Sequence, residues 1–438
     1  MNIPVLIKIL VIFLAVVFAS ARRIHLGLAA ALGGLVIALW SGLGLQDSML
    51  AFLKEAFNPD TIFLLILMSF IMAFSSAMKK SGIMDKLASS LQLVSPSPKL
   101  ALALAPLLIG TLPMPGGAVL SAPLVDSMDK ERNRSPDTLS AANYWFRHIL
   151  ELSWPLYPAF ILTSSLSGIK AGRLIMLNLY APILLFLLGL LFILPSGPAK
   201  DRQKSQKDAS WQAAFRKHAG SLLEGITPLA VVIILYAILD MVWRFVSPAL
   251  KLSGAASILV GRYGPIYSGL ALGSFLVLKS KNGKGAFKNS INMATWRLIG
   301  VILGIRIFSA LLGAAGVAEQ AADELYRTGI PAILAVAVLP FVAGMVTGVG
   351  FGYVGLAFPI IIGLASGITS LSFEALIVFS GAFGYAGMML SPLHVCMVVS
   401  AEHFKVGLAS IMKRSALPLS IFVILAIAYS NILSMLLS

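Results

Sequence analysis

The sequence predicts an all-α polytopic membrane protein made of two inverted repeats, each with five membrane spans and one re-entrant hairpin. Three observations lead to this prediction. First, 58% of the 438 residues are hydrophobic and only 12% are charged, which is the composition of a chain that lies mostly in lipid. Second, two apolar segments broken by proline and glycine occur at matching places in the two halves. Third, basic residues cluster in alternate loops.

Ten apolar segments are long enough to cross a bilayer, which takes about 20 residues. They lie near residues 3–20, 24–43, 60–78, 138–167, 174–194, 225–245, 256–278, 292–313, 373–402 and 414–436. Arg22 and Arg23 follow the first segment, which favours a membrane span over a cleaved signal peptide. Pro155 and Pro392 interrupt two of the segments, and we expect broken helices there.

The two interrupted segments lie near residues 97–127 and 330–365, in addition to the ten spans. Leu100, Ala101, Ala103, Pro106 and Gly110 recur in the second half, in the same order and at the same spacing, as Leu334, Ala335, Ala337, Pro340 and Gly344. Irregular backbone at membrane depth is tolerated only where it is buried in protein or lines a wet cavity. Such segments in corresponding halves indicate the binding site of a secondary transporter, so we expect two re-entrant hairpins whose tips meet near the midplane.

Each half then crosses the membrane an odd number of times, which inverts the second half relative to the first. We expect a first repeat over 1–195, a linker over 196–220 and a second repeat over 221–438. The chain has 33 Lys and Arg against 18 Asp and Glu, a net charge of +15. In a soluble protein this would suggest a nucleic-acid partner. Here the alternation of basic loops fits the positive-inside rule, with the linker cytoplasmic, both termini outside and no nucleic acid.

The first hairpin tip contains Pro115, Gly116 and Gly117, which cannot continue a helix. A helix N-terminus exposed at such a tip attracts anions through its unpaired N–H groups, and freed carbonyls can instead bind Na⁺. Thr111 and Ser121 add hydroxyl oxygens. The alternative is a simple helix kink packed against a neighbour.

The second hairpin tip contains Thr347, Gly348, Gly350 and Gly352. The glycine spacing superficially resembles a nucleotide-binding loop, but no strand precedes it. Small residues can also serve helix packing alone. The correspondence with the first segment favours a tip.

Asn143, Arg147 and Glu151 follow one another at four-residue spacing and share a helix face, with His148 beside them and Trp154 at the expected break. Ionisable residues inside a span are costly and indicate function. Arg147 offers a planar fork that suits a carboxylate, and Glu151 can neutralise it when the site is empty. The alternative is a purely structural Arg–Glu pair.

Ser391 and His394 lie at the second expected break. His394 can carry a proton near neutral pH or be a hydrogen-bonded core histidine. We expect Thr111, Glu151, Thr347 and Ser391 to contribute to a coupling-ion site. Arg306 is a further cation candidate, although it can also snorkel or pair. Because Cys396 is the only cysteine, we expect no disulfide, no cysteine-based metal site and no cofactor other than the coupling ion.

Three strings carry a resemblance to a known family: Asn-Tyr-Trp-Phe-Arg-His at 143–148, Trp-Pro-Leu-Tyr-Pro at 154–158 and Gly-Met-Met-Leu-Ser-Pro-Leu-His at 387–394. With the two hairpins, they resemble the ion transporter superfamily, and most closely its uncharacterised prokaryotic family known as domain of unknown function 401. The resemblance implies an elevator-type, homodimeric carrier in the inner membrane. The Ser-Asn-Thr tip motifs of its sodium–dicarboxylate members are absent, so substrate and coupling ion stay open.

The sequence thus predicts a secondary active transporter of a small organic anion, a carboxylate or sugar acid, coupled to Na⁺ or H⁺. One alternative is a cation/proton antiporter, for which Glu151 is the only good buried acid. A second is a channel or a membrane-embedded enzyme. No Walker loop, nucleophile elbow or His-Glu-x-x-His motif occurs, and we expect no enzyme activity.

Overall fold

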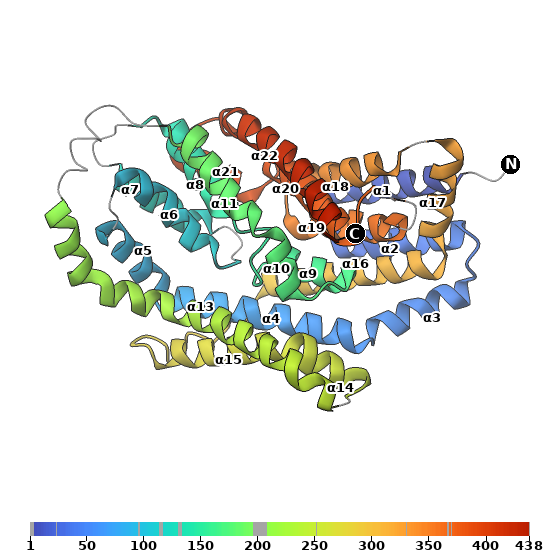
Figure 1. Cartoon of the computed structure of the whole chain (residues 1–438), viewed down its shortest axis with the longest axis horizontal. Helices are drawn as coiled ribbons and strands as arrows, with labels where there is room; N and C mark the ends of the chain where they lie inside the picture. Colours follow the sequence, from blue (N-terminus) through green and yellow to red (C-terminus); the bar gives the residue numbers. More distant parts are fainter. Residues whose placement is uncertain are drawn as a thin grey trace.

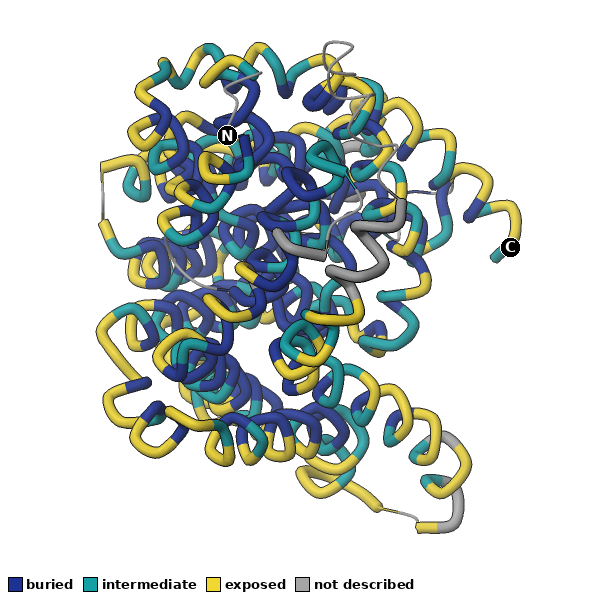
Figure 2. The backbone as a smooth tube through the Cα atoms, turned by 90° about the vertical axis from the view of Figure 1, so that its left-hand side faces the viewer, coloured by how far each residue is buried: buried dark blue, intermediate teal, exposed yellow. Residues whose placement is uncertain are grey.

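All regular secondary structure in the described part of the chain is helical (Figure 1). The computed structural model describes residues 4–22, 24–94, 97–113, 117–129, 134–195, 208–250, 252–329, 331–365, 368 and 370–437. Buried residues concentrate in the middle of the helical bundle, and exposed residues lie along its outer helices and ends (Figure 2).

The first half contains the helical elements up to residue 193. They are α1 Val5–Ala21, α2 Leu26–Trp40, α3 Leu45–Ala56, α4 Pro59–Lys80, α5 Ile83–Val94, α6 Pro98–Gly110, α7 Ala118–Met128, α8 Pro136–His148, α9 Pro158–Ser167, α10 Ala171–Asn178, α11 Tyr180–Leu188 and the π-helical turn η1 Gly189–Ile193.

The second half begins with a long helix that runs beneath the first half in the view of Figure 1. Its elements are α13 Asp208–Leu250, α14 Gly254–Ile258, the π-helical turn η2 Leu259–Tyr263, α15 Gly264–Lys279, α16 Met293–Ala314, α17 Val317–Thr328, α18 Ala332–Thr347, α19 Gly350–Leu364, α20 Phe373–Met389, α21 Val395–Phe404 and α22 Leu408–Leu437. Helix α13 includes the second part of the expected linker 196–220, whereas residues 196–207 lie outside the described residues.

Three helices of the first half begin with the same local signal. Asn58, Ser97 and Ser135 each accept a backbone N–H of the first turn on the side chain, and a proline follows directly. The side-chain oxygen satisfies an otherwise unpaired donor, and the proline ring fixes a helical φ where no donor is needed. These caps set the starts of α4, α6 and α8.

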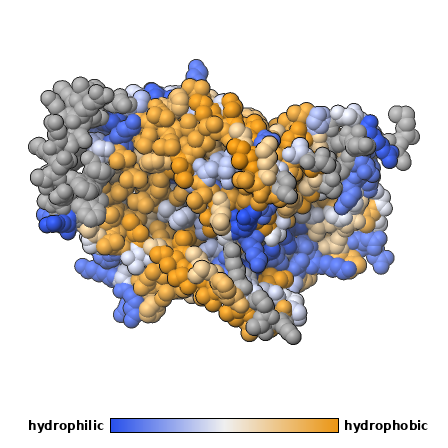
Figure 3. All heavy atoms as spheres, viewed as in Figure 1, coloured by the Kyte–Doolittle hydropathy of each residue, from blue (hydrophilic) through white to orange (hydrophobic). Residues whose placement is uncertain are grey.

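Five described helices are long and apolar enough to cross a membrane, which makes the chain a multi-pass membrane protein. They are Pro59–Lys80, Ala171–Ile193, Arg216–Ser247, Met293–Ala314 and Leu408–Leu437, and several shorter apolar helices accompany them. Much of the face in Figure 3 is hydrophobic, and hydrophilic residues gather toward its right-hand end, over α3 and α17.

Several expected spans differ from the helices of the structure. α1 and α2 have 17 and 15 residues, fewer than a straight crossing of average thickness needs. α3, α5 and α17 are additional helices that no apolar segment indicated. All three contain charged residues, so a search for apolar segments passes over them.

Both interrupted segments and both broken helices are present. α6 and α7 pack against each other, as do α18 and α19. Each of these four helices has 16 residues or fewer. The chain leaves helical geometry between α8 and α9 and again between α20 and α21, at Pro155 and Pro392. The two pairs of short helices are called the first hairpin (α6–α7) and the second hairpin (α18–α19) below, and the turn between the two helices of each pair is its tip.

The helices of the two halves begin at corresponding positions. The intervals along the chain between the starts of α4, α5 and α6 are the same as those between the starts of α16, α17 and α18. The intervals between the starts of α8, α9 and α10 are likewise repeated by α20, α21 and α22. The residue spacing seen in the sequence is therefore also the spacing of the helices.

Candidate functional site

The hairpins of each half contact the broken helix of both halves. α6 packs against α8 of its own half, and α18 packs against α20. The second helix of each hairpin reaches across: α7 packs against α21, and α19 packs against α9. Residues from both hairpin tips and both helix breaks are thereby brought to one region of the protein.

The first tip lies directly on the guanidinium of Arg147. Arg147 is in the last turn of α8 and is 4% exposed. A methyl group at Gly117, the residue before α7, would overlap its Cζ and both Nη atoms, and one at Gly110 would overlap its backbone carbonyl. The Tyr157 hydroxyl donates to the Gly110 carbonyl at 2.5 Å. The first hairpin is thus fitted to Arg147 at two glycines.

The second tip lies on the carboxylate of Glu151. Glu151 is 7% exposed. It does not share a helix face with Asn143 and Arg147 as expected, because α8 ends at His148 and Glu151 lies in the break that follows. A methyl group at Gly350, the first residue of α19, would lie 2.5 Å from its Oε1. The carboxylate also borders a cavity of about 20 Å³, which Thr163, Asn178 and Tyr353 help to line. A space of this size holds about one water molecule.

The second tip also packs on the break between α20 and α21. Gly348 ends α18 with φ of 64°, a left-handed conformation that favours glycine. A methyl group there would lie 3.0 Å from the Ser391 hydroxyl and 2.9 Å from the backbone nitrogen of His394. Gly352 packs in the same way against the Thr347 side chain.

The polar side chains of α8 make hydrogen bonds across the two halves. Asn143 donates its amide to the Ser400 hydroxyl at 2.8 Å. Its Oδ1 is buried with no hydrogen-bond partner in the described part of the chain. His148 and His394 approach each other with 3.0 Å between their Nε2 atoms. These contacts hold α8 against α21.

The remaining expected residues are held mostly by their own surroundings. The Trp154 indole donates to the Thr111 carbonyl at 2.8 Å. The hydroxyls of Thr111 and Thr347 donate to carbonyls of their own helices, Leu108 and Ala343, at 2.6 Å each. Ser121 is fully buried, and its hydroxyl has no partner among the described residues. Pro115 and Gly116 lie outside the described residues.

The expected residues therefore form three groups of contacts. Gly117 accompanies Arg147, whereas Gly350 accompanies Glu151. Gly348 joins Ser391 and His394, which in turn contacts His148. The coupling-ion set is divided: Glu151 borders the cavity, but Thr111, Thr347 and Ser391 are not among the residues that line it.

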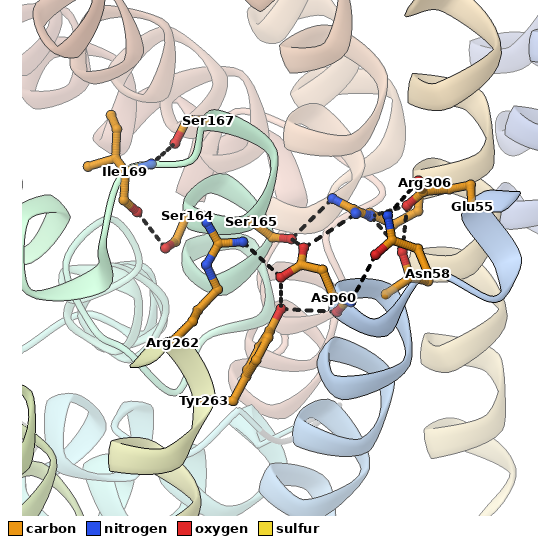
Figure 4. A network of polar contacts seen from close by, with 11 residues as sticks. Glu55, Asn58, Asp60, Ser164, Ser165, Ser167, Ile169, Arg262, Tyr263 and Arg306 are labelled. Atoms are coloured by element: carbon orange, nitrogen blue, oxygen red, sulfur yellow. Dashed lines mark hydrogen bonds and ion pairs between the residues drawn. The ribbon is translucent and has the colours of Figure 1, made fainter. Parts of the chain in front are cut away.

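A second polar cluster lies outside the expected site, at the start of α4 (Figure 4). Asp60 pairs with Arg262 at 2.8 Å and with Arg306 at 3.3 Å, and Arg306 also pairs with Glu55 at 2.7 Å. The Ser165 hydroxyl from α9 donates to Asp60 at 3.2 Å. Arg306 is therefore a paired residue. The sequence does not indicate its partners, because they belong to the other half of the chain.

Comparisons with known proteins place the chain in a family and a fold. Residues 4–432 match the family described as "Protein of unknown function (DUF401)". The crystal structure of the YdaH transporter from Alcanivorax borkumensis is similar, with a TM-score of 0.58 and 16% sequence identity, over 86% of each chain. No curated protein matches the sequence. At this identity the likeness establishes the fold, and the similar structure is that of a transporter with an unusual topology.

Proposed function

Because the chain belongs to the DUF401 family, as its sequence motifs predicted, and has the fold of the YdaH transporter, we propose that it is a secondary active transporter of a small organic anion. The substrate is a carboxylate or a sugar acid, and Na⁺ or H⁺ drives its movement. The observation that supports this most is the meeting of both hairpin tips at one buried cation and one buried carboxylate, Arg147 and Glu151.

Arg147 supplies the charge that an anion needs at this depth. An anion that leaves water loses hydration, and a nearby guanidinium offsets that cost. The guanidinium also binds a carboxylate through two parallel N–H groups. Gly117 stands against it at the start of α7, where unpaired helix N–H groups further favour negative charge.

Glu151 supplies the coupling site of the proposal. Its carboxylate borders the small cavity together with Thr163 and Asn178. The Asn178 amide donates to the Leu174 carbonyl at 3.1 Å, which leaves its own carbonyl oxygen able to accept or ligate. A carboxylate with neutral oxygens nearby suits Na⁺, and the carboxylate alone suits a proton. The cavity is large enough for either.

The transport mechanism that we propose is an elevator with two inverted repeats in a homodimer. The matching intervals between helix starts in the two halves support the repeat. So do Gly110, which packs on the backbone of Arg147, and Gly344, which packs on the backbone of Gly384. The pair Gly110 and Arg147 in the first half and the pair Gly344 and Gly384 in the second half occupy corresponding positions of the proposed repeats. The elevator and the dimer rest on the family resemblance.

A cation/proton antiporter is the second candidate, and the cavity beside Glu151 favours it. An antiporter needs the buried acid but no anion site. The two functions therefore differ in their dependence on organic anions, and one experiment separates them.

The test is a ligand screen followed by transport in proteoliposomes. Carboxylates and sugar acids are added to the purified protein with and without Na⁺, and thermal unfolding is followed. A ligand at a hundred times its dissociation constant stabilises the folded state by about 2.7 kcal/mol. We expect one class of anion to raise Tm and to exchange across the membrane in counterflow. No stabilising anion, together with Na⁺-driven proton movement in empty vesicles, would replace this proposal with the antiporter.

A further inference from the structure

Three side chains with metal-binding atoms meet where the two broken helices face each other. His148 ends α8, His394 precedes α21, and Cys396 lies in the first turn of α21. Their donor atoms all lie within 4.8 Å of one another, and the residues are 4%, 6% and 8% exposed. The transport proposal gives Cys396 no role, and the single cysteine led us to expect no cysteine-based metal site, since the sequence does not show that two histidines lie beside it.

The two imidazoles have the geometry of neighbouring ligands. Their Nε2 atoms are 3.0 Å apart. Two nitrogens bound to one ion at about 2.0 Å are separated by roughly 3.3 Å at tetrahedral angles and roughly 3.5 Å at trigonal angles. The Cys396 Sγ lies within 4.8 Å of a ring nitrogen of each histidine. Small adjustments would therefore place one ion among the three atoms.

The other nitrogen of His148 is already fixed as in many metal sites. Its Nδ1 lies 2.7 Å from the Tyr144 carbonyl, an acceptor that holds the ring proton on Nδ1 and leaves the Nε2 lone pair free. A backbone carbonyl in this position orients ligating histidines generally. Without an ion, the free lone pair accepts a hydrogen bond from the N–H at His394 Nε2.

We propose that this cluster, called the His–His–Cys site, binds a soft monovalent ion of the Cu(I) type. A thiolate donor favours soft ions such as Cu(I), and imidazole also suits copper. The cluster has three donors among the described residues, which suits Cu(I), whereas structural Zn²⁺ almost always takes four. Arg147 already brings positive charge next to His148, so a monovalent ion is less costly there than a divalent one.

The protons balance without any redox step. On binding, the Cys396 thiol gives one proton to solvent, and the proton of His394 Nε2 moves to Nδ1 of the same ring. That Nδ1 is buried with no hydrogen-bond partner in the described part of the protein, so its N–H is left unpaired. Copper enters and remains as Cu(I). The competing interpretation is a hydrogen-bonded histidine pair that only joins α8 to α21.

The test measures Cu(I) binding to the whole reduced protein without oxygen, in competition with a chromophoric Cu(I) chelator. We expect one Cu(I) per chain. Affinity should fall at least a hundredfold in Cys396→Ser and at least tenfold in His394→Gln. His403→Gln is the matched control, because His403 is exposed at the other end of α21 and should bind as the unmodified protein does. Size-exclusion elution and thermal unfolding report whether each variant folds.

X-ray absorption on the unmodified copper-loaded protein needs no variant. We expect one sulfur and two nitrogen ligands, and the only possible thiolate is Cys396, the single cysteine. Equal copper uptake by the unmodified protein and Cys396→Ser would overturn the proposal. So would binding of Zn²⁺ in preference to Cu(I), or a copper spectrum without sulfur. None of these results depends on transport, so the anion proposal stands or falls separately.

Discussion

Glycine at the hairpin tips brings backbone against charged side chains. Gly117 touches the guanidinium of Arg147, and Gly350 touches the carboxylate of Glu151. Any larger residue would displace a buried charge from its position. Close-packed interiors do not absorb such additions without shifts elsewhere, which typically cost about 1–3 kcal/mol.

We predict that Gly117→Ala and Gly350→Ala each reduce substrate binding at least tenfold while the protein still inserts. The added methyl would push Arg147 or Glu151 aside. Gly313→Ala is the matched control, since nothing lies within 4 Å of a methyl group there. Isothermal titration of the ligand found in the screen measures the effect. Unchanged affinity in both tip variants would show that the tips do not shape the site.

Much of the candidate site could be predicted from residue spacing. Arg147 and Glu151 are four residues apart, and their depth in an apolar segment marks them as costly, although α8 ends at His148 and leaves Glu151 in the break. Cys396 could not be predicted as a partner of His148, because nothing local links residues on different broken helices. Pro392 places His394 at a break. Only the folded structure shows that this break faces the end of α8.

At the scale of helices, the cluster around Asp60 joins five elements, since Glu55 adds α3 to the four that Asp60 itself links. Asp60 in α4 binds Arg262 of η2, Arg306 of α16 and Ser165 of α9. The two arginines balance the charges of Asp60 and of a second acid, Glu55. Removing one member of such a partly buried network leaves charges without compensation.

We therefore predict that Asp60→Asn destabilises the folded protein by about 3 kcal/mol, at the low end of the range for buried pairs because the Arg262 side chain is 32% exposed. Glu224→Gln is the control. It removes the partner of Lys86 in a pair whose side chains are 43% and 59% exposed, and such pairs contribute about 0–1 kcal/mol. Chemical unfolding in detergent compares the two. Equal stability of both variants would mean that the cluster is dispensable.

The helices and breaks could be predicted from the sequence where residues within the same segment determine them. Clusters of proline and glycine marked both hairpin tips and both breaks, whereas single prolines such as Pro106 and Pro340 lie inside continuous helices. The amphipathic helices α5 and α17 were not predictable from hydropathy, because their burial depends on neighbours distant in the chain. α13 extends into the polar linker for a related reason: mean hydropathy does not report helix formation.

For the whole molecule, the orientation of the halves is the open prediction. The distribution of Lys and Arg predicts that the two halves cross the membrane in opposite orientations. The matching intervals between helix starts in the two halves agree with a repeated unit. We predict that a cysteine at Asn282 is labelled from the cytoplasm, and cysteines at Asp47 and Gln320 from outside. All three are exposed. Membrane-impermeant maleimide on oriented vesicles, with Cys396 replaced by alanine, makes the measurement. Labelling of Asn282 and Gln320 from one side would contradict the inverted repeat.

The most direct test concerns Arg147 as the residue that holds the anion. Substrate affinity is measured for Arg147→Gln, Arg147→Lys and the double variant Arg147→Gln, Glu151→Gln, with Arg173→Gln as the control, because Arg173 pairs with Glu374 at 2.6 Å outside the site. A hydrogen bond to a charged group contributes about 1.5–3 kcal/mol. We expect Arg147→Gln to lose about tenfold to a hundredfold in affinity, Arg147→Lys to recover part of it, and the double variant to remain defective. Recovery of binding and transport in the double variant would show that Arg147 only neutralises Glu151, and would contradict the account.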